Sequence, residues 1–416
     1  MNDRQAPASA IWMLGITQIV GYGTLYYSYG ILAPAVAAEL AWSQQWVFAV
    51  LSVSLLASAF LAPIAGSLAD RFGATRLMVL GSLAAAAALL LCALAPGRIG
   101  FVVGVLAMEL ASCFVLYSTA FVAIVQLGGR GRSITHLTLI AGFASTLFWP
   151  LTTVLHEHLG WREVLAIFAA LNVGICLPIH WWLARFSRSI GNEDRIVPAA
   201  AGVSVTGPRH GWSPIFVLML AGFAIEGFML SAILVQMVPL LTMVGIGAAA
   251  VFVASLFGPS QVASRFVNML LGHGLSQTWL ALGATAALAG GLAVLLVTAP
   301  SVPGAILFAL LFGFGSGLMS IVSGTLPLEL FGHARYGSYV GWITAARQFC
   351  SAFAPFGLTF TMAGVGVFPA LWLNVLVGLL GIAAFAGIAL ISRSRNKSRK
   401  TAAANEATAT LGAEIV

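Results

Sequence analysis

The sequence contains very little charge. Aspartate, glutamate, lysine and arginine make up only 7% of its 416 residues, whereas hydrophobic residues make up 60% and the mean hydropathy is +1.00. Soluble domains carry roughly 25% charged residues, so this chain cannot cover its surface with groups that water solvates. The composition therefore excludes an ordinary soluble enzyme or binding domain and indicates a protein that lies in a membrane.

Residues that carry enzymatic chemistry are also scarce. The four cysteines, Cys92, Cys113, Cys176 and Cys350, fall in apolar stretches without the spacing of metal ligands or secreted disulfides. We interpret them as packing residues, with a thiophilic role for Cys113 or Cys350 as the alternative. The sequence has no GxxxxGK-S/T loop for ATP hydrolysis and no evident nucleophile–base pair. We predict that the protein is not an enzyme and needs no metal or cofactor.

Apolar stretches of about 20 residues recur from one end of the chain to the other, and each can cross about 30 Å of hydrocarbon as a helix. Lipid requires every backbone polar group to be satisfied within its segment, and the alternating pattern of a membrane barrel is absent. No small-residue cleavage site follows the first stretch, so we expect it to be retained. We predict an all-α membrane protein with twelve transmembrane helices, at residues 11–33, 46–69, 77–95, 100–125, 134–155, 163–186, 213–238, 247–271, 277–299, 303–326, 337–362 and 366–391.

The positions of lysine and arginine predict the orientation of these helices. With the N-terminus inside, fifteen of these residues lie at inner helix ends and only two, Arg98 and Arg162, lie at outer ends. Since inner loops carry the excess of positive charge, we expect both termini to be cytoplasmic. The net charge of +7 then reflects topology and attraction to anionic lipid, and we expect no nucleic-acid partner.

One long polar interval divides the chain. Residues 187–212 mix charge, proline, glycine and serine without apolar periodicity, which is typical of a flexible linker. This predicted cytoplasmic linker separates an N-terminal six-helix half, 1–186, from a C-terminal six-helix half, 213–391. Residues 392–416 begin with a basic segment and continue into AAANEATAT, and we expect them to form a disordered basic cytoplasmic tail.

The most specific pattern is the segment GSLADRFGATR, residues 66–76, between the second and third predicted helices. A short charged turn with glycine lets a chain leave the bilayer and re-enter it at once. The segment resembles the signature loop of the major facilitator superfamily, G-x-x-x-D-R-x-G-x-x-R. The matching residues are Gly66, Asp70, Arg71, Gly73 and Arg76.

This resemblance implies a transporter whose two six-helix halves rock between inward-open and outward-open states. In that family, charge pairs and helix-end contacts of residues like Asp70, Arg71 and Arg76 hold the halves in one state and release them in the other. The first, fourth, seventh and tenth helices would line a central path. The second half has no good copy of the loop, because GHGLS, residues 272–276, contains no acid.

Four charged residues fall inside predicted helices, where burial of charge is costly and usually functional. Arg265 and Arg347 always carry charge and offer a planar fork to a carboxylate, so they are candidate anion-binding residues. Glu109 and Glu226 are candidate proton carriers, because a carboxyl group in a low-dielectric site holds its proton more readily than in water. The alternative is that each acid pairs statically with an arginine.

The placement of the two arginines adds a finer resemblance. A basic residue in the eighth helix and another in the eleventh resembles the anion-binding arrangement of the oxalate/formate and monocarboxylate branches. Arg265 lacks the neighbouring aspartate of animal monocarboxylate carriers.

Two further helices carry polar side chains at helical spacing. Gln18, Tyr22 and Tyr26 share one face of the first helix, where aromatic rings with hydroxyl groups can stack on a substrate and hydrogen-bond to it. Ser320 belongs to a serine row in the tenth helix. We predict that these residues bind substrate. The alternatives are hydrogen bonds to neighbouring helices for the first set and close helix packing for the serines.

These features lead to three functional hypotheses. The first is a proton-coupled transporter of a small organic anion such as a monocarboxylate, driven by the proton gradient. The second is efflux of drugs or toxic compounds, although the fifth helix lacks the G-x-x-x-G-P-x-x-G-G pattern of many drug/proton antiporters. The third is a non-transporting receptor or scaffold. We expect a monomer in the inner (plasma) membrane whose partners are a small-molecule substrate and the lipid bilayer.

Overall fold

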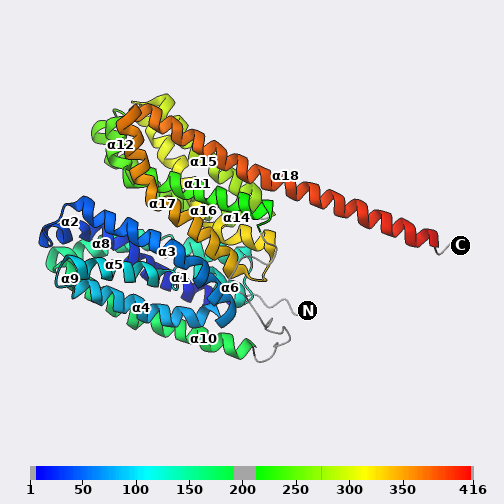
Figure 1. The fold of residues 1–416 in the computed structure, drawn as a ribbon, viewed down its shortest axis with the longest axis horizontal. Helices are drawn as coiled ribbons and strands as arrows, with labels where there is room; N and C mark the ends of the chain where they lie inside the picture. The colour runs from blue at the N-terminus through cyan, green and yellow to red at the C-terminus, as the bar shows by residue number, and fades with distance from the viewer. Residues whose placement is uncertain (1–5, 192–211, 273, 414–416) are drawn as a thin grey trace.

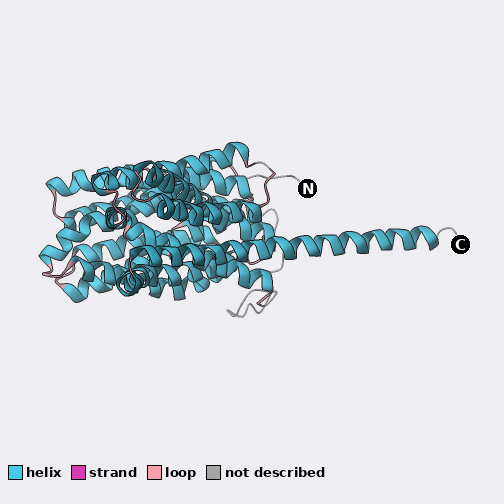
Figure 2. Ribbon diagram, turned by 90° about the horizontal axis from the view of Figure 1, so that it is seen from above, coloured by secondary structure: helices cyan, strands magenta, loops and turns pink. Residues whose placement is uncertain are grey.

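The computed structural model describes residues 6–191, 212–272 and 274–413. Within these residues the chain is helical, without strands, and forms two groups of long helices that lie beside one another (Figure 1). The predicted all-α membrane fold is confirmed. Figure 2 shows that most helices run nearly parallel, as expected when all of them cross the same apolar layer.

Long helices in the first group are interrupted near their middles. The elements are α1 (Ala8–Tyr22), the π-helix η1 (Gly23–Tyr27), α2 (Ser28–Glu39), α3 (Gln44–Phe72), α4 (Ala74–Ala93), α5 (Arg98–Ser112), α6 (Tyr117–Gln126), α7 (Gly131–Ala141), α8 (Ala144–His158), α9 (Trp161–Leu171), the π-helix η2 (Asn172–Cys176) and α10 (Leu177–Gly191). Two helix pairs, α5–α6 and α7–α8, each correspond to one predicted span that is broken.

The second group begins with shorter, interrupted helices and ends with four long uninterrupted ones. Its elements are α11 (Pro214–Val235), α12 (Met237–Met243), the short 3-10 helix η3 (Gly247–Ala249), α13 (Ala250–Ser255), α14 (Phe257–Leu271), α15 (Gln277–Thr298), α16 (Val302–Phe331), α17 (Tyr336–Val365) and α18 (Val367–Ala413). The predicted linker lies mostly outside the described residues, and its first part, 187–191, belongs to α10.

Eleven helical stretches in the described part of the chain are long and apolar enough to cross a membrane. The twelfth predicted span, 337–362, corresponds to α17, which is 30 residues long but is not among these eleven. Polar residues explain the lower hydropathy of α17, because Thr344, Arg347, Gln348 and Ser351 lie within about two turns of this helix.

The C-terminal segment differs from the expectation. We predicted that residues 392–416 are disordered, but the structure describes α18 as continuing through them to Ala413. Figures 1 and 2 both show this helix extending well beyond the bundle. Alanine, lysine and arginine are strong helix formers, so a segment that follows directly from a membrane helix can continue its hydrogen-bond ladder.

The two halves meet near the end of the bundle that carries residues 66–76, which we call the loop end. There α3 and α17 cross at glycines: a Cβ atom added at Gly341 would lie 2.6 Å from the carbonyl oxygen of Ala62, and one at Gly66 would overlap the backbone of Gly337. Small residues therefore let the two backbones touch. At the opposite end, α2 and α12 lie apart in Figure 1.

Candidate functional site

The interrupted helices place aromatic residues in the middle of the first half. The π-helical turn η1 puts residues five apart on the same face, so Tyr22 and Tyr27 lie together with ring centroids 6.3 Å apart. The Asn172 side chain in η2 donates a hydrogen bond of 3.0 Å to Thr24 Oγ1 and thereby joins the two π-helical turns. A local irregularity in the backbone therefore sets the direction of these tyrosines.

Further rings complete a group that we call the aromatic wall, which consists of Tyr22, Tyr26, Tyr27, Tyr117 and Trp149. The Tyr22 and Tyr117 ring centroids are 4.7 Å apart, Tyr27 meets Trp149 edge-on at 6.0 Å, and Tyr26 meets Tyr27 at 5.4 Å. Tyr22 and Tyr26 were predicted from the sequence. Tyr27, Tyr117 and Trp149 were not, because their approach depends on the π-helical turn and on the breaks that precede α6 and α8.

The second half presents two arginines toward this wall. Arg347 lies within electrostatic range of Tyr22, Tyr26 and Tyr117, and Arg265 lies within the same range of Tyr27 and Tyr117. The aromatic wall and the arginines belong to opposite halves of the molecule. A ligand bound between them would therefore touch both halves at once.

Arg347 on α17 forms an ion pair with Glu226 on α11. Arg347 Nε lies 2.9 Å from Glu226 Oε2, and an Arg347 terminal nitrogen donates a hydrogen bond of 3.2 Å to Oε1. The Glu226 side chain is 1% exposed, whereas the Arg347 side chain is 32% exposed. The close approach depends on Gly227, where a Cβ atom would lie 2.6 Å from Arg347 Cγ. Glu226 thus binds the edge of the guanidinium formed by Nε and one terminal nitrogen. The Arg347 side chain remains partly exposed, so the other edge is accessible to a ligand.

Arg265 on α14 is buried without an acid. One terminal nitrogen donates a hydrogen bond of 3.1 Å to the backbone oxygen of Thr138 on α7, and the other donates one of 3.1 Å to Ser320 Oγ on α16. The residue is 4% exposed, its Nε has no hydrogen-bond partner among the described residues, and no ion pair there involves it. Neutral oxygens therefore solvate this charge without cancelling it.

Glu109 on α5 is a buried acid without a described cation. It is 3% exposed, and no ion pair in the described part of the chain includes it. It lies within electrostatic range of Tyr26, which belongs to the aromatic wall. The two predicted proton carriers thus differ: Glu226 is paired in this conformation and Glu109 is not.

Gln18 and Ser320 both make internal hydrogen bonds. Gln18 is fully buried, and its Nε2 donates a hydrogen bond of 2.7 Å to the backbone oxygen of Val115, in the break between α5 and α6. Ser320 Oγ accepts from Arg265 and donates to the backbone oxygen of Ser316 at 3.1 Å. Gln18 therefore supports the interrupted helix, whereas Ser320 orients Arg265.

At the loop end, Asp70 joins the halves directly. Its Oδ1 accepts a hydrogen bond of 2.8 Å from the backbone N–H of Gly337, and its Oδ2 accepts from the backbone N–H and the hydroxyl of Ser338 at 2.7 and 2.8 Å. These donors form the first turn of α17, where the helix dipole favours negative charge. The carboxylate of the first half thus caps a helix of the second half.

The remaining residues of the segment shape the turn around Asp70. Gly73 has a φ of +91°, which favours glycine, and it ends α3 so that α4 can begin at Ala74. Arg71 and Arg76 are exposed, and the Arg71 guanidinium lies 5.0 Å from the Phe72 ring centroid. Gln126, which sequence reasoning missed, fastens the turn: its Nε2 donates to Ala69 O and its Oε1 accepts from Ala74 N–H, both at 2.9 Å.

Comparisons with known proteins agree on one family and fold. The model of the Major Facilitator Superfamily matches residues 14–355. The structure resembles the human organic anion transporter MFSD10 (TETRAN), with 13% identity, a TM-score of 0.70, and coverage of 92% of this chain and 100% of that one. It also resembles the proton:xylose symporter XylE, with 14% identity, a TM-score of 0.62, and coverage of 90% and 95%. No curated protein sequence matches the chain.

Proposed function

Because the chain belongs to the Major Facilitator Superfamily, we propose that it carries a small organic anion across the membrane by alternating access, coupled to protons. The substrate is an anion of monocarboxylate type that binds between the aromatic wall and the two arginines. At such low sequence identity the similarity to an organic anion transporter supports only the fold. The substrate proposal therefore depends on the chemistry of the site.

The observation that carries the proposal is the uncompensated charge of Arg265. A buried cation without a counter-ion is unfavourable in a low-dielectric interior, and the cost falls when an anion binds beside it. Arg265 is 4% exposed, and its Nε–H has no hydrogen-bond partner among the described residues. A substrate carboxylate would accept a charge-assisted hydrogen bond from this guanidinium, which a neutral or cationic compound cannot do.

Arg347 and Glu226 provide a route for proton coupling. An anion that binds the accessible edge of Arg347 would weaken the ion pair between Arg347 and Glu226. Glu226 would then accept a proton more readily. Glu109 supplies a second carboxyl group in the opposite half, beside Tyr26. One proton carrier in each half would couple proton transfer to the relative movement of the halves.

The contacts between the halves at the loop end support the interpretation that this conformation is closed on the cytoplasmic side. The excess of lysine and arginine at this end of the helices supports a cytoplasmic position for the loop end, and Asp70 with Arg265 joins the halves toward that end. We place the protein as a monomer in the inner (plasma) membrane, with both termini cytoplasmic. Release of these contacts would let the halves rock and open the site inward.

Uptake into proteoliposomes tests the substrate class. A panel of radiolabelled monocarboxylates, lipophilic cations and neutral sugars is presented at equal concentrations with an imposed proton gradient. We expect one or more carboxylates to accumulate and the cations and sugars to remain at the level of protein-free vesicles. Accumulation of a cation without any carboxylate would contradict the proposal and favour efflux of toxic compounds.

Glu109→Gln is expected to uncouple transport from the proton gradient. Glutamine has nearly the same shape but cannot carry a proton, so gradient-driven accumulation of the substrate should fall at least tenfold, whereas exchange of substrate across the vesicle without a gradient should remain. Glu157→Gln is the matched control, because Glu157 is exposed on α8. Normal accumulation in Glu109→Gln would remove Glu109 from the coupling mechanism.

A further inference from the structure

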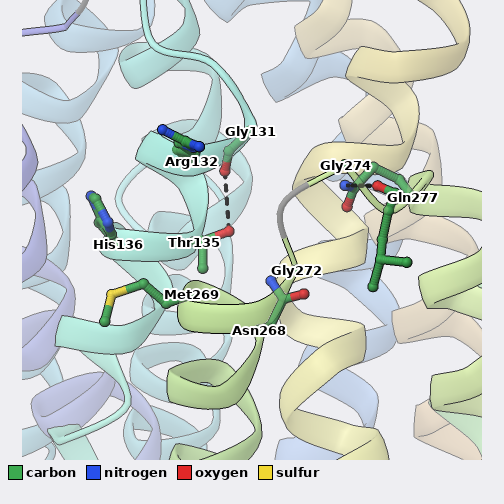
Figure 3. Close-up of a pocket in the computed structure, with 10 residues that line it drawn as sticks. Gly131, Arg132, Thr135, His136, Asn268, Met269, Gly272, Gly274 and Gln277 are labelled. Atoms are coloured by element: carbon green, nitrogen blue, oxygen red, sulfur yellow. Dashed lines mark hydrogen bonds between the residues drawn. The ribbon is translucent and has the colours of Figure 1, made fainter.

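A cavity lies between the two halves at the loop end, away from the aromatic wall. Its volume is about 390 Å³, in the range of small-molecule sites. One wall is the start of α7 in the first half, and the other is the end of α14 with Gly272, Gly274 and the start of α15 in the second half (Figure 3). A ligand in this cavity would therefore contact both halves.

The side chains that line the cavity favour an anion. Arg132 and His136 lie one turn apart on α7, and both are exposed. Asn268 and Gln277 on the opposite wall add amide groups, and none of the described lining residues is an acid. Gln277 Nε2 donates one hydrogen bond to the backbone oxygen of Leu275 at 3.4 Å, which leaves its second N–H for a ligand. The nearby acid Glu329 is already engaged, because its carboxylate accepts hydrogen bonds from the Gln277 backbone N–H at 2.8 Å and from Ser276 Oγ at 3.1 Å.

The two halves differ at equivalent junctions of the loop end. The junction between α3 and α17 contains a carboxylate of the protein, Asp70, whereas the junction between α14 and α7 does not. In the first half, Asp70 stands three residues before Gly73, whose φ is +91°, and binds the start of α17. In the second half, Gly274 has a similar φ of +86° beside the start of α7, but Leu271 stands three residues before it. Leu271 is 74% exposed and offers no charge to α7. The second junction therefore lacks the anion that holds the first one.

We propose that the cavity binds a phosphate group, supplied by an anionic phospholipid of the inner leaflet or by a soluble phosphate compound. The phosphate oxygens accept hydrogen bonds from Arg132 and His136 on one side and from the amide groups of Asn268 and Gln277 on the other. By bridging α7 to Asn268 on α14 and Gln277 on α15, the bound anion holds the halves together at the loop end and slows inward opening. This regulatory site is independent of the identity of the transported substrate.

Binding measurements on the full chain in nanodiscs test this site. Native mass spectrometry compares retention of phosphatidylglycerol over phosphatidylcholine in wild type, Arg132→Ala and Arg132→Lys. We expect Arg132→Ala to weaken phosphatidylglycerol binding about fivefold, because each basic residue near an anionic surface adds this much, and Arg132→Lys to retain most of it. A second arm measures protection of α7 from hydrogen exchange by inorganic phosphate in phosphatidylcholine nanodiscs.

The control is Arg188→Ala, which removes an exposed arginine of α10 outside the cavity. An effect of Arg132→Ala on phosphatidylglycerol alone identifies a lipid headgroup as the ligand, and an effect on inorganic phosphate identifies a soluble one. Equal binding by wild type and a stably folded Arg132→Ala in both arms would overturn the proposal. Equal losses in Arg132→Ala and Arg188→Ala would also overturn it, because they would indicate only general surface charge.

Discussion

Replacement of Arg265 by glutamine is expected to lower the affinity for the transported anion about 100-fold, because removal of one partner of a buried charge pair costs 2–5 kcal/mol. The same change should not unfold the protein. It removes a buried charge whose only described hydrogen-bond partners are the neutral oxygens of Thr138 and Ser320, so the thermal unfolding temperature should stay the same or rise. Equilibrium binding of the carboxylate found by uptake measures the first effect.

Two further variants separate charge from shape in this prediction. Arg265→Lys keeps the charge but loses the planar fork, so it should retain part of the affinity. Arg188→Gln changes an exposed arginine of α10 and should leave the affinity unchanged. If Arg265→Gln bound the anion as tightly as wild type, Arg265 would serve only to tie α14 to α7 and α16, and the anion proposal would lose its main support.

Asp70→Asn should slow turnover about tenfold while the affinity for substrate stays unchanged. The aspartate carboxylate accepts three hydrogen bonds from Gly337 and Ser338, and a hydrogen bond to a charged acceptor contributes ~1.5–3 kcal/mol. Without the charge, the state that is closed at the loop end loses stability relative to the open one. Because the proposed substrate site lies elsewhere, the change should affect the balance of states and not the contacts to substrate.

Spin-label distances across the loop end provide the direct measurement for this prediction. Labels on α4 and α15 should report a larger fraction of separated halves in Asp70→Asn than in wild type. Ser338→Ala removes one of the three hydrogen bonds and should give an intermediate shift. Transport by Asp70→Asn at the wild-type rate, with unchanged label distances, would show that this contact does not control the equilibrium.

The sequence predicted the local parts of this arrangement well. The spacing of Gly66, Asp70 and Gly73 identified the turn, because the turn geometry is encoded within a few residues. The partners of Asp70 lie 267 and 268 residues away on α17. Their position follows from how the halves pack, which no local pattern contains.

For the buried charges too, the sequence identified the residues but not their partners. Glu109, Glu226, Arg265 and Arg347 stood out because charge inside an apolar stretch is rare. Which of them pair was not readable, since the Glu226–Arg347 ion pair depends on close contact at Gly227 between α11 and α17. The uncompensated state of Arg265, on which the proposed function depends, became visible only when its neighbours Thr138 and Ser320 were placed.

Only Tyr22 and Tyr26 of the aromatic wall were predicted from the sequence, because the prediction assumed 3.6 residues per helical turn. The π-helical turn at Gly23–Tyr27 changes that spacing and adds Tyr27 to the face of Tyr22. Tyr117 begins α6 after a break at residues 113–116, which contain no proline that would predict it. Backbone irregularities at the centre of membrane helices therefore limit what periodicity can predict.

Substrate-dependent proton movement in proteoliposomes tests the central claim most directly. Wild type and Arg265→Gln are compared with a pH-sensitive dye inside the vesicles while a series of monocarboxylates is added outside. The account predicts a proton signal with at least one carboxylate in wild type and its loss in Arg265→Gln. A proton signal of equal size in both proteins, or none with any carboxylate in wild type, would contradict it.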